Sequence, residues 1–89
     1  MKIKLELFGA SRDFSNEDYL DLEVQDKASI NDLKNVIIKY LNKNFSRNES
    51  FIKIVKSSAF CSEHNEIIGD NYKITNDQKI GIIPPIGGG

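Results

Sequence analysis

Residues 29–43 read SINDLKNVIIKYLNK, and their apolar members recur at the spacing of one helix face. Ser29 is a favourable N-cap residue, and Asp32, three positions later, brings a negative charge to the positive end of the helix dipole. The stretch therefore predicts an amphipathic helix from Ile30 to about Lys43, whose apolar stripe needs a second layer to cover it. The positions in that stripe are Ile30, Leu33, Val36, Ile37, Tyr40 and Leu41.

Two alternating segments precede this helix. Lys2–Phe8 places Ile3, Leu5 and Leu7 on one face, which is typical of a half-buried strand. Tyr19–Val24 alternates in the same way through its leucines. The intervening Gly9–Asp18 is rich in turn-forming residues. We therefore predict a hairpin of two strands.

The segments that follow the helix are shorter and less regular. Asn44–Ser50 is polar and predicts a loop. Phe51–Lys56 fits either a turn of helix or a buried strand, and periodicity does not separate the two in so short a run. Ala59–Glu63 and Glu66–Ile68, with His64-Asn65 as a turn between them, predict a second hairpin.

The last strand is expected at Lys79–Ile83, after turns at Gly69–Asn71 and Thr75–Gln78. The resulting order is strand, strand, helix and then three shorter strands. This order is that of an α+β protein of the β-grasp class, a mixed sheet with one main helix packed across it. We expect residues 1–83 to form this domain and residues 84–89 to form an extended tail.

Composition limits the functions that are open to the chain. It has 89 residues, with 13 acidic against 12 basic side chains, so no strong field favours nucleic acid or anionic membrane as a partner. The single cysteine, Cys61, excludes an internal disulfide and a Cys-rich metal cluster. No apolar run approaches the roughly 20 residues of a membrane span. We expect a soluble, cytoplasmic protein whose partners are proteins.

The tail combines two prolines with a run of glycine. The prolines hold the chain extended and aim it away from the domain, and glycines can enter a slot too narrow for a side chain. These are the properties that a donor carboxylate at Gly89 requires. A frayed end or a cloning remnant is the alternative interpretation. The tail residues are Pro84, Pro85, Ile86, Gly87, Gly88 and Gly89.

The chemistry of such a tail would take place in other proteins. A free carboxylate is a poor electrophile, so it would first be activated as a mixed anhydride with AMP, and the ATP would be used by the activating enzyme. A persulfide could then attack the activated carbonyl, and the resulting thiocarboxylate on Gly89 would be a carrier-bound sulfur nucleophile. The carrier itself would need no bound cofactor and no catalytic side chain.

The sequence resembles the small subunit of molybdopterin synthase, a MoaD-like sulfur carrier of the ubiquitin-like β-grasp group. The most specific match is IGIIPPIGGG at residues 80–89, which is similar to the family ending of strand, Pro-Pro, aliphatic, small residue and Gly-Gly. Gly87 stands where Ser or Thr is usual. ITNDQK at 74–79 and LFGASRD at 7–13 also resemble family segments, although Asp77-Gln78 replaces a usual Gly-Asp. Residues 44–58 have no clear counterpart.

The resemblance implies a cycle with three partners. An adenylyltransferase related to ubiquitin-activating enzymes would adenylate Gly89, a sulfurtransferase would supply sulfur, and a large synthase subunit would use the thiocarboxylate to sulfurate a pterin precursor. The chain would be the non-catalytic subunit of a heterotetramer of two large and two small subunits, with the active site on the large one.

The resemblance also nominates contact residues for these partners. Phe8, Ile67 and Ile83 match positions that face partner proteins, and Arg12 matches an arginine that could pair with an acidic group on the activating enzyme. The three apolar residues could equally belong to the core, and Arg12 could be a solvated loop residue. An exposed apolar patch would favour the first interpretation.

Other functions stay open beside the sulfur carrier of molybdenum cofactor biosynthesis. The chain could be the thiazole-pathway carrier, a carrier for tRNA thiolation or a ubiquitin-like modifier of lysines, although the diproline argues against the first and the last. It could also be an interaction module with no chemistry. Cys61 and His64 are three residues apart, but a strand and a turn would point them in different directions, so we expect neither catalysis nor a metal site there.

Overall fold

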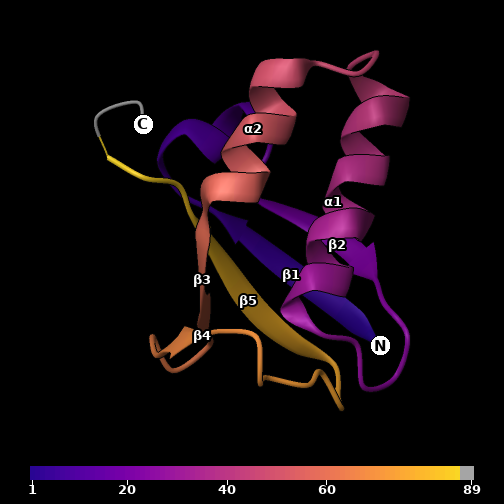
Figure 1. The fold of residues 1–89 in the computed structure, drawn as a ribbon, viewed down its shortest axis with the longest axis vertical. Helices are drawn as coiled ribbons and strands as arrows, with labels where there is room; N and C mark the ends of the chain where they lie inside the picture. Colours follow the sequence, from indigo (N-terminus) through magenta and orange to yellow (C-terminus); the bar gives the residue numbers. More distant parts are fainter. Residues whose placement is uncertain (87–89) are drawn as a thin grey trace.

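The computed structural model describes residues 1–86 and has two layers, a sheet and a pair of helices on one of its faces (Figure 1). In chain order its elements are β1 (Lys2–Leu7), the 3₁₀ helix η1 (Gly9–Phe14), β2 (Tyr19–Glu23), α1 (Ile30–Asn44), α2 (Glu49–Ser57), β3 (Ala59–Ser62), β4 (Ile67–Ile68) and β5 (Gln78–Ile83).

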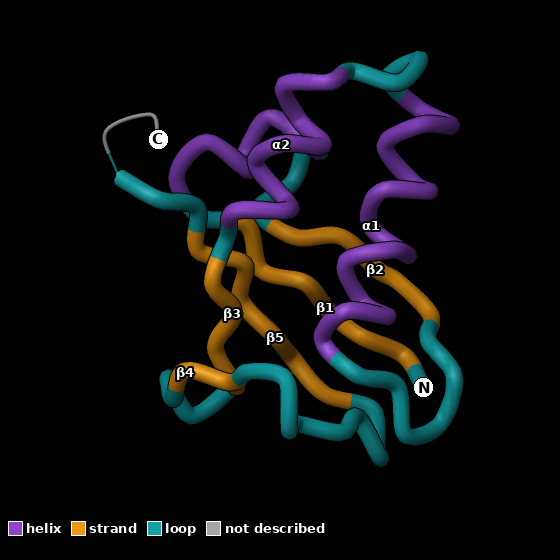
Figure 2. The backbone as a smooth tube through the Cα atoms, in the orientation of Figure 1, coloured by secondary structure: helices purple, strands orange, loops and turns teal. Residues whose placement is uncertain are grey.

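The sheet is mixed, with the strand order β2-β1-β5-β3-β4 (Figure 2). β5 lies between β1 and β3, parallel to β1 and antiparallel to β3, and the other neighbours are antiparallel. The expected mixed sheet with a helix across it is therefore confirmed. Because β1 and β5 are parallel, the two strands end at the same edge of the sheet, where Leu7 pairs with Ile82.

The core lies between α1 and the inner face of the sheet. Alternation along each strand places one set of side chains on this face, and Leu5 of β1 is paired with Ile80 of β5 and Leu20 of β2, all three buried. The apolar stripe of α1 covers them, so the predicted helix is confirmed in both position and orientation. Its buried residues are Ile30, Leu33, Ile37 and Leu41.

A capping box fixes the start of α1. The Asp32 backbone N–H donates to Ser29 Oγ at 3.0 Å, and the Ser29 backbone N–H donates to Asp32 Oδ2 at 3.0 Å. Asp32 thus takes the place that Glu or Gln usually has in this motif. The bond from the Ser29 backbone N–H, followed by that from its side chain, lowers the pKa of the Asp32 carboxyl below its ordinary value of 3.8.

This cap makes stability depend on pH in a defined direction. Because the pKa of Asp32 is lower in the folded state, its carboxylate stabilises the fold above the ordinary pKa, and that contribution is lost as the pH falls through the folded value. We expect Asp32→Asn to destabilise the protein at neutral pH and to differ less from wild type at about pH 3. Urea unfolding at both pH values measures this, and a gap that does not change with pH would contradict it.

The segment between β1 and β2 is more ordered than a turn. It contains η1, in which Ser11 and Phe14 are fully buried. Ser11 Oγ donates to the Phe8 carbonyl at 2.6 Å, and the Tyr40 hydroxyl of α1 donates to the Phe14 carbonyl at 2.9 Å. Turn-forming residues predicted a loop here, but tertiary contacts to Phe14 shape it into a helical turn.

The expected loop at residues 44–50 is wrong at its end, because α2 begins at Glu49. Asn48 caps this helix by accepting a bond from the Phe51 N–H at 3.1 Å. The Phe51 ring packs on Phe14 and Phe45, with centroid distances of 5.1 Å to each. The ambiguous run at residues 51–56 is therefore helix, and its aromatic contacts lie outside the sheet.

The remaining boundaries agree with the prediction within one or two residues. β3 and β4 form the expected hairpin, with Cys61 opposite Ile67. β5 begins at Gln78, one residue inside the turn that was expected at residues 75–78. Within residues 1–86, neither helix has the length and apolar character that a membrane-spanning helix requires.

Candidate functional site

The tail leaves the domain where β5 ends. Pro84 is buried and packs beside Gly9, where an added Cβ would lie 3.9 Å from Pro84 Cδ, whereas Pro85 and Ile86 are exposed. Gly9 has φ of +54°, a conformation that favours glycine. The chain thus emerges from the surface within two residues, and Ile86 is 100% exposed. Gly87, Gly88 and Gly89, which carry the predicted chemistry, lie outside the described residues.

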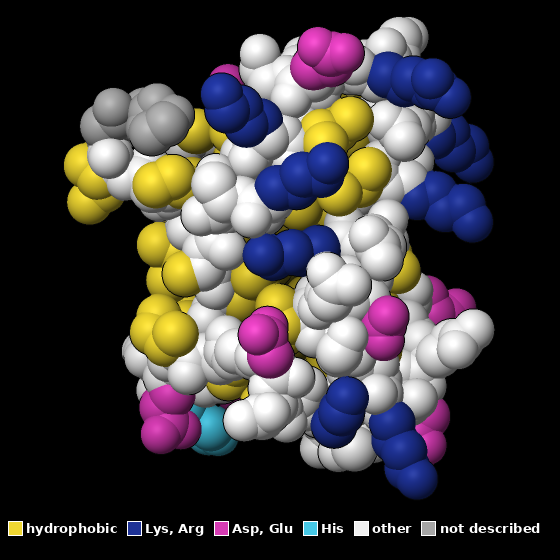
Figure 3. Space-filling view, viewed as in Figure 1, with side chains coloured by type: hydrophobic (Ala, Val, Ile, Leu, Met, Phe, Trp, Pro, Cys, Tyr) yellow, Lys and Arg dark blue, Asp and Glu magenta, His cyan; other side chains and the backbone are white. Residues whose placement is uncertain are grey.

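An apolar surface adjoins this exit on the open face of the sheet, opposite α1. The register puts Gly81 of β5 beside Cys61 of β3, and Cys61 in turn beside Ile67 of β4. Figure 3 shows hydrophobic side chains along the left edge, from the base of the tail toward β4. We call this surface the sheet patch, formed by Phe8, Ala59, Cys61, Ile67, Gly81 and Ile83.

The other half of the open face is polar. Lys79 and Glu6 form an ion pair at 3.3 Å, and the Lys4 ammonium lies 4.1 Å from the centroid of the Tyr19 ring. The charge of Glu17, and then its hydrogen bond, raise the pKa of the Tyr19 hydroxyl. Because charged residues are depleted from the centres of protein interfaces, the apolar half is the better docking surface.

Glycine at position 81 allows the Phe8 ring to lie close against β5. A Cβ at Gly81 would lie 2.8 Å from Cys61 Sγ and 2.9 Å from Phe8 Cε2, closer than real contacts allow. The Phe8 ring therefore covers the glycine while one of its sides stays open, with 36% of the residue exposed. The sheet patch thus depends on the glycine, because only a residue without a side chain leaves room for the Phe8 ring at this position.

We expect Gly81→Ala to lower the free energy of unfolding by about 1–3 kcal/mol, because the added methyl overpacks a buried site. The methyl should also displace the Phe8 ring, which NMR shifts of that ring report. The control is Gly69→Ala, where an added Cβ meets nothing within 4 Å, and it should change stability little. Equal effects at the two positions would contradict this packing.

The structure brings three of the predicted contact residues, Phe8, Ile67 and Ile83, to the open face of the sheet. Phe8 is 36% exposed, Ile67 is 70% exposed and Ile83 is half-buried, so the first two are surface residues rather than core. Arg12 is exposed on η1, and within residues 1–86 it forms no ion pair. Partner binding by these four residues stays a prediction.

Cys61 and His64 lie in different surroundings. Cys61 is 8% exposed, with its sulfur directed toward Gly81, while His64 lies in the exposed turn after β3. In the described part of the chain, no group of three or more His, Cys, Asp or Glu side chains is placed to hold a metal ion.

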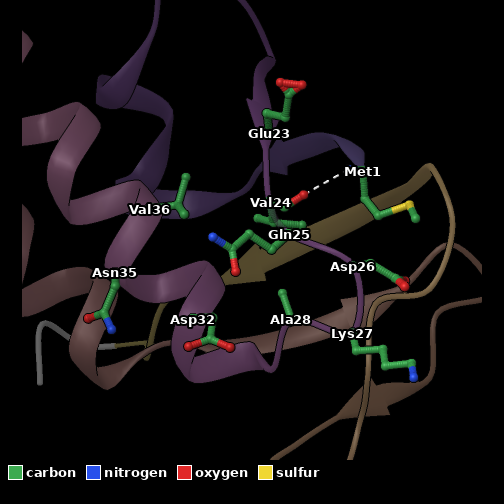
Figure 4. Close-up of a pocket in the computed structure, with 10 residues that line it drawn as sticks. All are labelled: Met1, Glu23, Val24, Gln25, Asp26, Lys27, Ala28, Asp32, Asn35 and Val36. Atoms are coloured by element: carbon green, nitrogen blue, oxygen red, sulfur yellow. Dashed lines mark hydrogen bonds between the residues drawn. The ribbon is translucent and has the colours of Figure 1, made fainter.

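A large hollow lies elsewhere, beside the start of α1 (Figure 4). It measures about 930 Å³ and is lined by Met1, the loop at residues 24–28 and part of α1. Its charged side chains do not converge, since Glu23 and Lys27 point away from each other. We do not regard it as the functional site, because binding sites need a few polar groups aimed at one point.

Solved structures resemble this fold along its whole length. One is described as "Putative molybdopterin converting factor, subunit 1" from Pyrococcus furiosus, with a TM-score of 0.69, 18% identity and coverage of 96% of this chain and 98% of that one. The chain has the ubiquitin-like β-grasp fold. SAMP1 from Haloferax volcanii has the same fold, with a TM-score of 0.67, 12% identity and full coverage of both chains. No protein-family model and no curated protein matches the sequence.

Sequence reasoning missed three members of the sheet patch in this β-grasp protein. Ala59 and Cys61 alternate with buried Phe60, so strand periodicity could have placed them on the open face with Ile67. Gly81 gave no such signal, because a glycine inside a strand is only a weak indication of close packing. Its role depends on the register with β3 and on the Phe8 ring.

Proposed function

We propose that this protein is a sulfur carrier whose reactive group is the carboxyl terminus of Gly89, and that it serves a molybdopterin synthase. The Gly89 carboxylate attacks the α-phosphorus of ATP on an activating enzyme, and pyrophosphate leaves. A persulfide then displaces AMP to give an acyl disulfide, and a thiol reductant releases the thiocarboxylate. A large synthase subunit receives that sulfur for a pterin precursor.

The observation that carries this proposal is the way the tail leaves the domain. β5 is held between two strands, Pro84 is buried, and Ile86 two residues later is fully exposed, so no flexible spacer separates a rigid body from the glycines. A rigid base is useful here because catalysis in a partner's site depends on accurate placement of the carboxylate. The sheet patch lies beside this base and supplies an exposed apolar surface for the partner.

The fold supports the proposal but is shared by proteins of more than one function. The likeness to a molybdopterin converting factor subunit agrees with the pterin pathway. The likeness to SAMP1, a ubiquitin-like small archaeal modifier, supports a second candidate, in which the activated Gly89 is joined to lysines of target proteins. Both candidates use the same activated terminus, and both require Gly89 to be the last residue of the functional chain.

A reconstituted reaction separates the two candidates. The protein is incubated with an activating enzyme, ATP and a persulfide donor, and then with a large synthase subunit and the pterin precursor. The proposal predicts formation of the dithiolene product, with return of Gly89 to a carboxylate. Isopeptide adducts on lysine without any sulfurated pterin would instead assign the protein to the modifiers.

A further inference from the structure

A notch opens beside the base of the tail, between α2, η1 and the diproline. Its volume is about 270 Å³, just below the range of 300–1,000 Å³ that is usual for small-molecule sites. That size suits one or two side chains of a protein better than a cofactor. We call it the tail notch, and its walls include Ala10, Lys53, Ile54, Ser57, Pro84 and Pro85.

The walls of the tail notch are mostly apolar, with one cation. The Ser57 hydroxyl already donates to the Lys53 carbonyl at 2.9 Å, so it has no need of a ligand. The Lys53 side chain is exposed, and within residues 1–86 no carboxylate lies within 4 Å of its ammonium. The notch therefore offers mostly apolar walls and a cation that no carboxylate of residues 1–86 neutralises.

The two helices, one of which carries Lys53, are strongly basic. Residues 33–58, which contain most of α1 and all of α2, hold six basic side chains and one acidic one, Glu49, and so carry a formal charge of +5. Because the whole chain carries −1, the rest of it carries −6. Figure 3 shows Lys and Arg side chains gathered over the helices. The basic members are Lys34, Lys39, Lys43, Arg47, Lys53 and Lys56.

We propose that the tail notch binds a segment of a partner protein in which an apolar side chain is flanked by carboxylates. The apolar side chain fills the notch, and the carboxylates pair with Lys53 and the basic surface around it. Such complementarity speeds association and selects partners more than it adds affinity. The biological use of the notch rests on the proposed function, because an enzyme that takes up the tail must approach its base.

Two other occupants fit the observations less well. Single-stranded nucleic acid needs aromatic platforms for its bases, and no aromatic residue lines the notch. A second copy could offer Ile67 with Glu66 beside it, but a contact of this kind joins two different surfaces and leads to open filaments unless it closes into a ring. A separate partner avoids that outcome.

The test is an NMR titration of the full ¹⁵N-labelled chain with the peptide Glu-Leu-Glu-Leu-Glu, acetylated and amidated at its ends. We expect shift changes to gather at the amides of Ala10, Lys53, Ile54 and Ser57. The peptide Lys-Leu-Lys-Leu-Lys should cause none. Lys53→Glu should weaken binding about fivefold to tenfold. Lys27→Glu, with the same change of charge at the far hollow, should leave binding unchanged.

Several results would overturn the proposal. These are no shifts with the acidic peptide, shifts confined to the sheet patch, equal binding by Lys53→Glu, or tighter binding of an oligouridylate at the same amides. Amide shifts that change on dilution of the protein alone would assign the notch to a second copy. The titration needs neither ATP nor sulfur, so a failure of the carrier chemistry leaves its result unaffected, and the reverse also holds.

Discussion

A chain that ends at Gly88 is expected to take up no sulfur and still to unfold at the same urea concentration as the full chain. Removing one residue shortens an extended tail by about 3.3–3.6 Å. A misplacement of about 1 Å at a reacting centre can already cost 100-fold in rate. The body should be unaffected, because the chain is fully exposed by Ile86.

The matched variants separate tail length from other effects. A chain with one alanine added after Gly89 should fail in the same way, because its carboxylate is misplaced in the opposite direction. Gly69→Ala changes a glycine outside the tail and should be loaded normally. Loading of the shortened chain within a few-fold of the wild-type rate would show that Gly89 is not the reactive residue.

The second large effect is expected at the sheet patch. Ile67→Lys should weaken binding to the large synthase subunit or to the activating enzyme by about 10-fold to 100-fold, because it places a charge where the partner would bury an apolar side chain. Since Ile67 is 70% exposed, the free energy of unfolding should change by no more than about 0.5 kcal/mol.

Calorimetric titration together with urea unfolding measures both quantities. Thr75→Lys adds the same charge at an exposed position in the loop before β5, and it should bind like wild type. If Ile67→Lys bound both partners normally, the sheet patch would not be their docking surface. If Ile67→Lys bound poorly but also unfolded at a clearly lower urea concentration than wild type, the weaker binding would reflect a damaged fold and not a lost interface contact.

The sequence predicted those elements whose own residues determine them. α1 has an uninterrupted apolar stripe and a polar cap at Ser29, and the strands β1 and β2 alternate clearly, so local pattern and tertiary structure agree. β5 was predicted from its isoleucines and from Pro84, which ends the strand because proline has no backbone N–H to donate to a neighbouring strand. Together these elements predicted the β-grasp arrangement.

The elements that the sequence did not predict depend on contacts made elsewhere. η1 is held by Tyr40 of α1 and by burial of Phe14, neither of which is visible in a run of turn-forming residues. α2 is short, and its N-cap Asn48 lies in a stretch rich in asparagine and serine, where a cap is hard to tell from a loop. Ser46 and Arg47, in the connection between α1 and α2, have φ of 51° and 61°, a conformation that their residue types do not predict.

The candidate site was predictable only where its residues are contiguous in the sequence. The residues of the tail follow directly from sequence, whereas the tail notch depends on α2, an element whose position the sequence left open. The sheet patch was partly predictable. The resemblance nominated Phe8 and Ile67, whereas Cys61 and Gly81 could be assigned to the patch only from the strand register. Surfaces formed by several distant segments need the topology before they can be predicted.

The most direct test of the account is the intact mass of the protein after incubation with an activating enzyme, ATP and a persulfide donor. Replacement of one oxygen by sulfur adds about 16 Da. We expect this gain to depend on ATP and to be located at Gly89 by fragmentation. An unchanged mass under conditions in which the activating enzyme loads a known carrier, or a gain located at Cys61, would contradict it.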